Sequence, residues 1–355
     1  MRGKVQAVEL GLKCGKRISH GENGEDTNSK ASHEDGAEPL GTRTNSYRKY
    51  GGQGFTSSPE FLSSPLCNAL EVSECYQAAC EGDIDRVKSL AQLFLSESSK
   101  ANAEPNPRWL YDSLSVAIQN QNLDIVQFLL DIGVVDGDLP AEDAVRARAF
   151  KVLELFIDRG WDINKPMGHS RPPMLSIPLC NADKEMVVWF LNHGADPNRR
   201  CDWDLAPMSE AMYDAPLDLI KYLFSRGADA RYGQLLHHAV HRKEDTLQVV
   251  QWLVENGAPT NELKYETDPI GYWWREPFGL GTPLHRAAEL GKKDIVTYLL
   301  CHGANCLKVD SRGKTPRFWA ENEGHTDVAL ILKEAEDRSS ALNTGVFAGK
   351  SRSLI

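Results

Sequence analysis

Apolar residues recur at helical spacing through the middle of the chain, and each run ends at a glycine. These glycines follow one another at intervals of 27 to 46 residues: Gly133, Gly160, Gly194, Gly227, Gly257 and Gly303. Residues four and five positions before each glycine are apolar, and the set continues upstream at the spacing of one helix face. Glycine has no Cβ and readily takes the left-handed conformation that ends a helix. The pattern therefore predicts a series of amphipathic helices, each capped by a glycine.

A second helix is predicted before each of these, and it is clearest in TPLHRAAELGKKD at 282–294. Thr282 is a good helix cap, and Pro283 suits the first helical position because it needs no partner for an N–H group. The small residues Ala287 and Ala288 allow neighbouring helices to approach closely, and Gly291 turns the chain into the next helix. Two helices per unit, repeated near every 33 residues, predict a solenoid.

These residues resemble the motif of the ankyrin-repeat family. Weaker copies stand at 171–185, 205–218, 233–245 and 313–327, and a degenerate first copy at 75–90. The resemblance implies an all-α solenoid of about eight helix-turn-helix units over residues 71–337, with β-turn fingers between units. The unit at 141–160 is short, and most units lack the Thr-Pro-Leu-His residues, so we expect irregular turns there.

The two ends of the chain differ from this array. Residues 1–70 are rich in Gly, Ser, Asn, Glu and Lys and poor in aliphatic residues, so they cannot bury enough apolar surface to offset the loss of chain entropy. We expect a disordered N-terminal segment over 1–70 and a loose C-terminal tail over 338–355.

Composition and motif content disfavour several classes of function. The net charge of −10 disfavours nucleic acid as a partner, because a phosphate backbone needs clustered Lys and Arg. Eight cysteines are scattered without a CxxC pair, and no run approaches the length of a membrane span, so we expect an intracellular protein, cytoplasmic or nuclear, with free thiols. Motifs of hydrolases, P-loop proteins, dinucleotide-binding proteins and zinc proteases are absent, which predicts no catalysis and no cofactor.

An aromatic-rich column stands five residues before the capping glycines. We interpret it as the continuous core between neighbouring repeats rather than as a ligand ladder, because one repeat cannot bury its apolar face alone. The column comprises Phe128, Leu155, Trp189, Tyr222, Trp252 and Tyr298.

Two groups of potential metal ligands are also interpreted as structural. His237 and His241 in HHAVH could share a helix face, but no cysteine pair or carboxylate at ligand spacing accompanies them. His237 also occupies the motif position of His285, which in this family commonly holds the turn. Cys301 and Cys306 lack further zinc ligands, so we expect free thiols and no metal site.

The resemblance implies one modification. Some ankyrin repeats are hydroxylated at an asparagine that follows Asp-x in the turn beyond the capping glycine. Asn164 and Asn198 match that position, whereas Asn261 and Asn305 fit it more loosely. The competing interpretation, which we favour, is that these side chains only stabilise the turn.

The array breaks its rhythm once, within GYWWREPFGLG at 271–281. Gly257 and Thr282 are 25 residues apart, whereas Gly303 and Thr315 are 12 apart. The extra residues predict a long finger at about 262–281, and insertions in repeat proteins map to one face, often the binding face. We expect Tyr272, Trp273, Trp274, Arg275 and Phe278 to form part of a partner site. The alternative, that the tryptophans fold back over the core, remains open.

The leading functional hypothesis is a non-catalytic protein-protein interaction module, an adaptor, scaffold or inhibitor. It would bind a protein partner, whose identity the sequence does not reveal, through the concave finger and first-helix face. The alternative is a regulatory or targeting subunit in which the N-terminal segment carries the signal and the repeats dock it. The sequence predicts no oligomeric state.

Overall fold

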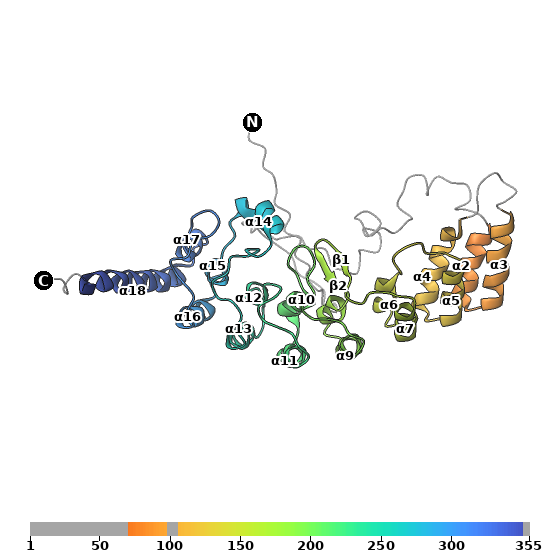
Figure 1. The fold of residues 1–355 in the computed structure, drawn as a ribbon, viewed down its shortest axis with the longest axis horizontal. Helices are drawn as coiled ribbons and strands as arrows, with labels where there is room; N and C mark the ends of the chain where they lie inside the picture. The colour runs from red at the N-terminus through yellow and green to blue at the C-terminus, as the bar shows by residue number, and fades with distance from the viewer. Residues whose placement is uncertain (1–69, 98–105, 351–355) are drawn as a thin grey trace, which may run out of the picture. The chain divides into compact units, whose positions relative to one another are not determined.

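The computed structural model describes residues 70–97 and 106–350, which fall into two compact units that divide after Asp162 (Figure 1). Residues 1–69 of the N-terminal segment expected to be disordered lie outside the described residues. Both units are built from helix pairs. Within the described residues, eight such pairs follow one another, which confirms the predicted all-α array of about eight repeats.

The first unit holds three helix pairs, preceded or joined by short turns. Its core lies between the helices of each pair and between neighbouring pairs, where Leu129, Leu153 and Phe156 are fully buried. The elements are α2 (Leu70–Glu81), α3 (Ile84–Glu97), the 3-10 helix η5 (Pro107–Leu110), α4 (Tyr111–Gln119), α5 (Leu123–Asp131), α6 (Ala141–Arg146) and α7 (Phe150–Asp158). The short unit expected at 141–160 is thus a complete helix pair.

The second unit holds five helix pairs and one inserted helix. It begins with a hairpin in which β1 (Pro166–Gly168) pairs antiparallel with β2 (Arg171–Pro173), with Pro166 opposite Pro173. The pairs are α8 (Ser176–Cys180) with α9 (Lys184–Asn192), α10 (Pro207–Asp214) with α11 (Leu217–Ser225), α12 (Leu235–Ala239) with α13 (Thr246–Glu255), α15 (Pro283–Glu289) with α16 (Lys293–Cys301), and α17 (Pro316–Asn322) with α18 (Thr326–Lys350). The inserted helix is α14 (Pro269–Arg275), followed by the 3-10 helix η6 (Glu276–Phe278).

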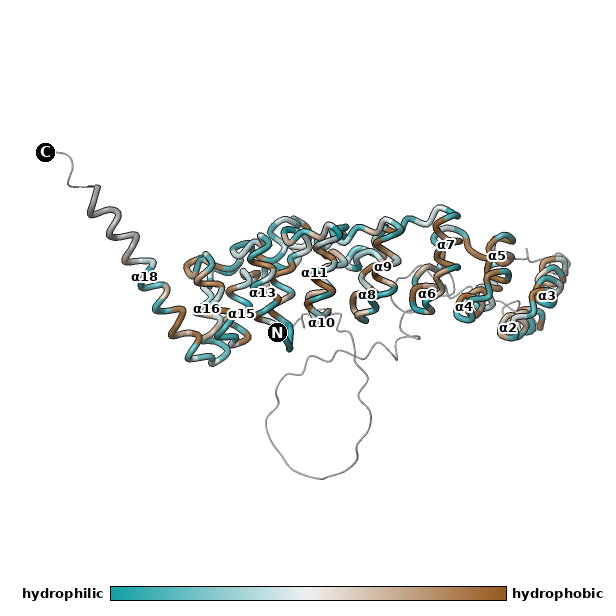
Figure 2. The backbone as a smooth tube through the Cα atoms, turned by 90° about the horizontal axis from the view of Figure 1, so that it is seen from below, coloured by the Kyte–Doolittle hydropathy of each residue, from teal (hydrophilic) through white to brown (hydrophobic). Residues whose placement is uncertain are grey.

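The second helices of this unit form one row and the first helices another. Figure 1 shows α9, α11, α13 and α16 aligned on one side, with α10, α12 and α15 beside them and α14 on the far side of that second row. Along each helix hydrophobic and hydrophilic residues alternate (Figure 2), as an amphipathic helix requires. The apolar faces meet between the rows, where Phe190, Leu223, Leu253 and Leu299 have no exposed surface.

The aromatic-rich column is not the core. All six of its residues, from Phe128 to Tyr298, are only half-buried, and the fully buried column is the next one along, four residues before each glycine. Large rings at the flank of the helix stack instead on their own C-terminal turn: Trp189 on His193 at 4.0 Å and Tyr298 on His302 at 3.9 Å. Consecutive residues of a helix point about 100° apart, so the positions four and five residues before the glycine face different sides. The expected core column was therefore wrong by one position.

The turns between paired helices keep one geometry even where the sequence departs from glycine. Gly291 takes the left-handed conformation with φ 63°, and Gln121, Arg148 and Ala182 take it at the corresponding turns with φ of 60°, 54° and 50°. A residue with a Cβ tolerates this region at a modest cost. Most units lack the motif residues and yet keep this turn, so the irregular turns that were expected are absent at these three positions.

The last helix is longer than expected. α18 spans Thr326–Lys350 and therefore continues through most of the segment for which the sequence predicts a loose tail from 338. Among the described residues, no helix combines the length and apolarity needed to cross a membrane.

Candidate functional site

The fingers of the second unit are joined by asparagine side chains. The Asn198 amide donates to the Gly227 carbonyl at 2.8 Å, and its oxygen accepts from the Asp229 backbone N–H at 2.8 Å. Asn164 bridges Gly194 and Asp196 in the same way, at 2.9 and 2.7 Å. Each asparagine thus satisfies one carbonyl and one N–H of the next finger. Hydroxylation of Asn164 and Asn198 stays a prediction.

Replacing Asn198 with alanine is expected to lower the free energy of unfolding by about 1–2 kcal/mol, because two backbone groups of the next finger, one of them partly buried, lose their partner. Chemical denaturation of the full chain measures the change. Asn322→Ala, on the exposed face of α17, is the matched control. An Asn198 variant as stable as that control would contradict the structural role.

A second set of side chains holds the fingers from the start of the first helices. His285 accepts from the Thr282 N–H through Nδ1 at 3.0 Å and lies 3.0 Å from the Lys314 carbonyl through Nε2. A neutral ring with its proton on Nε2 makes both bonds. His237 reaches the Gly281 carbonyl at 3.3 Å, and Ser209 reaches Gly233 at 2.6 Å. The structure places His237 in the structural role expected from the motif.

The remaining histidines of HHAVH, the buried His238 and the half-buried His241, lie beside a tyrosine. The Tyr213 hydroxyl lies 2.8 Å from His238 Nδ1, and its ring lies near His241 at 6.2 Å. Burial lowers the pKa of His237 and His241 to about 3 and that of His238 well below its usual value. The described residues contain no group of three or more His, Cys, Asp or Glu side chains arranged to hold a metal ion.

The long finger is folded and anchored rather than extended. Its first part follows the preceding finger: the Tyr265 N–H donates to the Gln234 side chain at 3.1 Å, and the Lys264 N–H donates to the Gly281 carbonyl at 3.0 Å. Its end is held by Ser311, whose hydroxyl donates to the Glu276 carbonyl at 2.7 Å and accepts from the Leu280 N–H. Both ends of the insertion are therefore fixed to repeats of the second unit.

α14 begins within this insertion because its first residues suit a helix start. Asp268 caps the helix by accepting from the Ile270 N–H at 3.2 Å, and Pro269 takes the first helical position. Gly271 is buried against Asp268, where a Cβ would lie 2.1 Å from the carboxylate. The insertion is thus a short helix with a defined underside, not only a long turn.

The predicted site residues divide between the two faces of α14. Trp273 and Trp274 are 68% and 64% exposed and contact each other edge-to-face at 5.2 Å. Phe278 is 56% exposed, whereas Tyr272 is half-buried. Arg275 turns toward the repeats. Its guanidinium carbon lies 4.0 Å from the ring centroid of Trp203 and 4.6 Å from that of Tyr265.

One exposed residue of this face was missed by the sequence reasoning. Ile270 is 64% exposed and stands three and four positions before the tryptophans, the spacing that puts side chains on one helix face. That spacing could have identified it once a helix was assumed. We call Ile270, Trp273, Trp274 and Phe278 the aromatic patch.

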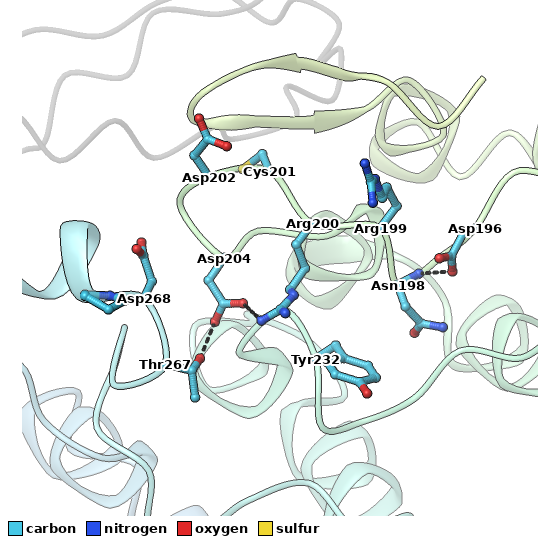
Figure 3. Close-up of a pocket in the computed structure, with 11 residues that line it drawn as sticks. Asp196, Asn198, Arg199, Arg200, Cys201, Asp202, Asp204, Tyr232, Thr267 and Asp268 are labelled. Atoms are coloured by element: carbon cyan, nitrogen blue, oxygen red, sulfur yellow. Dashed lines mark hydrogen bonds and ion pairs between the residues drawn. The ribbon is translucent and has the colours of Figure 1, made fainter. Parts of the chain in front are cut away.

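An open pocket of about 620 Å³ adjoins α14 (Figure 3). Its walls come from three fingers: residues between Asp196 and Asp204, Tyr232, and residues 267–269. Asp204 is buried at its centre and accepts from Arg200 at 2.6 Å and from Thr267 at 3.3 Å. The sequence reasoning did not find this pocket, because its lining residues are far apart along the chain.

Comparisons with known proteins agree with this architecture. The family described as ankyrin repeats (3 copies) matches residues 236–341. The chain is 34% identical over 128 residues to the probable 26S proteasome regulatory subunit p28 of Saccharomyces cerevisiae, covering 35% of this chain and 47% of that protein. It is 33% identical over 102 residues to diacylglycerol kinase zeta of Rattus norvegicus (29% and 10%), and 20% identical over 326 residues to the human transient receptor potential cation channel subfamily A member 1 (80% and 28%).

The chain spans less than half the length of each of these relatives. Ankyrin repeats generally mediate protein–protein interaction and are not catalytic modules themselves. The family match at residues 236–341 falls on the last three helix pairs of the array, and the same capped helix pairs precede them. Residues 236–341 of the chain therefore match the ankyrin-repeat family.

Proposed function

We propose that this chain is a non-catalytic interaction module that binds a protein partner through the concave finger and first-helix face and the aromatic patch. The observation that carries the proposal is the exposure of Trp273 and Trp274, at 68% and 64%, on a helix anchored at both ends. Exposed contiguous apolar surface rimmed by polar residues marks interaction sites.

The aromatic patch is suited to binding because its helix is already ordered. Tryptophan is enriched among the residues that dominate interface energies, since one ring buries a large area for only two side-chain torsions. Arg275 contributes by holding α14 against Trp203 and Tyr265, so little conformational entropy remains to be lost on association. Tyr272, half-buried at the base of the helix, would contact the partner at the edge of the patch.

The double substitution Trp273→Ala and Trp274→Ala is expected to abolish partner capture and leave thermal stability nearly unchanged, because both side chains are exposed and core packing is untouched. Tagged wild-type and variant chains are compared by affinity purification with mass spectrometry, and thermal unfolding is followed by circular dichroism. Leu330→Ala is the matched control, since Leu330 is 57% exposed on α18 outside the patch.

A large loss of stability in the tryptophan variant with capture preserved would show instead that these rings support the fold. Capture equal to wild type at equal stability would remove the patch from the binding surface. In either case the array itself remains a candidate binding surface through its fingers and first helices.

Deleting residues 1–65 tests the alternative in which the N-terminal segment carries the signal. That segment lies outside the described residues. If the repeats bind the partners, the partners are still captured after the deletion. If the N-terminal segment carries the signal, most of them are lost. The relative named as a proteasome regulatory subunit supports an intracellular setting, cytoplasmic or nuclear.

A further inference from the structure

We propose that Arg275 is a positioning residue rather than a contact residue of the aromatic patch. Its contact with the rings of Trp203 and Tyr265, which we call the Arg275 latch, holds α14 closed on the fingers. When the latch is lost, α14 opens locally while the repeats stay folded. The latch is a property of the chain alone, and its consequence for partner binding rests on the proposed function.

α14 buries little apolar surface that could hold it in place. Four of its seven residues are exposed. The other three, Gly271, Tyr272 and Arg275, have the spacing of one helix face. Glycine contributes no side chain, and Tyr272 is only half-buried. The burial of apolar area therefore stabilises the closed position weakly, and the contacts of Arg275 gain weight.

α14 is also too short to be stable by itself. It comprises seven residues, Pro269–Arg275, and isolated helices shorter than about 12 residues are marginal in water. Figure 1 shows α14 outside the two rows of paired helices. Its helical conformation therefore depends on contacts with the fingers, and opening of α14 also unfolds it.

The latch is made by aromatic rings and not by a carboxylate. The guanidinium carbon of Arg275 lies 4.0 Å from the ring centroid of Trp203 and 4.6 Å from that of Tyr265, well within the distance of about 6 Å at which a cation and a ring attract. Among the described residues, the Arg275 side chain has no hydrogen bond or ion pair. Its attraction to the two rings is thus the interaction that holds this end of the helix.

Both rings are fixed by residues outside α14. The Trp203 N–H donates to the His169 carbonyl at 3.1 Å. Tyr265 is 7% exposed, and its N–H donates to the Gln234 side chain at 3.1 Å. The rings therefore stay in place when α14 opens, and the latch can close again.

The segments on either side of α14 are also anchored without Arg275. The Lys264 N–H donates to the Gly281 carbonyl at 3.0 Å, which joins the two ends of the insertion. After the helix, the Glu276 carbonyl accepts from the Ser311 hydroxyl at 2.7 Å. α14 can consequently open between these anchors without disturbing the repeats. Only the closed helix presents the aromatic patch in one arrangement, so a smaller closed fraction lowers the apparent affinity for a partner.

Arg275→Met is expected to raise the rate at which chymotrypsin cleaves after residues 272–274 about tenfold, because it removes the cation and keeps the side-chain bulk. A protease cuts such a segment only after local unfolding, so the rate measures the open fraction of α14. Cleavage of the full chain is followed by mass spectrometry. The free energy of unfolding of the repeats, measured by circular dichroism, is expected to stay unchanged.

Trp203→Leu tests the same contact from the other side and leaves the cleaved segment unaltered. It is expected to accelerate the cleavage as much as Arg275→Met. The double variant is expected to be cleaved no faster than either single variant, because both changes remove one interaction. Trp203→Phe and Arg275→Lys keep a ring and a cation, and each is expected to be cleaved more slowly than the variant that removes the group.

Arg226→Met is the matched control. Arg226 lies on the ring of Tyr222 at 5.8 Å, at the end of α11 and outside the insertion. This change removes an arginine and a cation–ring contact of the same kind, and it is expected to leave the cleavage of α14 unchanged.

The proposal is overturned if neither Arg275→Met nor Trp203→Leu accelerates cleavage beyond the control. It is also overturned if the two effects add in the double variant, or if the free energy of unfolding falls to the same extent. Cleavage is measured without a partner, so this failure is distinguishable from failure of the proposed function. An unchanged cleavage rate rejects the latch even where Trp273→Ala with Trp274→Ala abolishes capture, and accelerated cleavage retains the latch even where that variant captures normally.

Discussion

Substituting Arg242 with methionine is expected to lower the free energy of unfolding by about 3–5 kcal/mol, although this residue is not part of the aromatic patch. Arg242 is 4% exposed. Its guanidinium donates to the carbonyls of Met212 at 3.0 Å and Ala215 at 2.9 Å, with a longer bond to Ala211 at 3.4 Å. These carbonyls end α10, and methionine keeps the side-chain bulk while removing the donors.

The reason for this dependence is a proline in the turn after α10. In the unit of α15, the corresponding carbonyls accept from the N–H groups of Gly291 and Lys292. Pro216 stands where Lys292 stands in that unit and has no N–H to donate. The side chain of Arg242, from the next repeat, donates where this turn lacks the backbone N–H of residue 216, so its loss removes this donor from the buried carbonyls of Met212 and Ala215.

Chemical denaturation measures the total effect, and native-state hydrogen exchange of α10 and α12 locates it, since repeat arrays do not always unfold in one step. Lys243→Met is the control. Lys243 is the exposed neighbour of Arg242 and donates no hydrogen bond to the carbonyls at the end of α10. A variant of Arg242 no less stable than this control would show that water or a shifted turn replaces the guanidinium.

Acidification is expected to destabilise the second unit, by on the order of 5 kcal/mol between pH 6.5 and pH 5. Burial lowers the pKa of His237 and His241 to about 3 and of His285 to about 4, and it lowers that of His238 further still. The folded state keeps these rings neutral, whereas the unfolded chain binds protons near pH 6.5. Stability is therefore full above about pH 6.5 and is lost as the pH falls toward 4.

Three carboxyl groups of the second unit whose pKa burial raises oppose this trend in part: Glu210, Glu262 and Glu336. Burial raises the pKa of Glu210 to about 7, so its folded-state carboxyl is protonated below that pH and its contribution is lost as the pH rises through 7. Lysines and arginines around the histidines, including Lys264 and Arg286, further disfavour the protonated rings. Four histidines have strongly lowered pKa values, whereas Glu210 has the one large shift among the three opposing carboxyl groups, so the net direction remains destabilisation by acid.

Free energies of unfolding measured across this pH range check the prediction. His241→Gln is expected to make the loss smaller by about 1.5 kcal/mol, because one titrating group is removed. His169→Gln is the control, since the side chain of His169 is 89% exposed. The same reduction in both variants would contradict a contribution from the buried cluster.

The amino-acid sequence by itself determined the repeat architecture. The spacing of apolar residues and capping glycines specifies helix pairs, because each unit must bury one helix face against its neighbours. The break in that spacing between Gly257 and Thr282 located the insertion. Helix periodicity and turn chemistry are local properties, and so they can be derived from neighbouring residues.

Only the tertiary structure decided which residues are buried and which are exposed. The aromatic-rich column proved half-buried and the adjacent column formed the core, a difference of one position along a helix. Arg275 contacts Trp203 across a large sequence separation, while Trp273 and Trp274 on the same short helix face solvent. The pocket joins Asp202, Tyr232 and Asp268 from three fingers. These relations depend on how the repeats stack and how the insertion folds across them, and sequence spacing carries no information about contacts of that range.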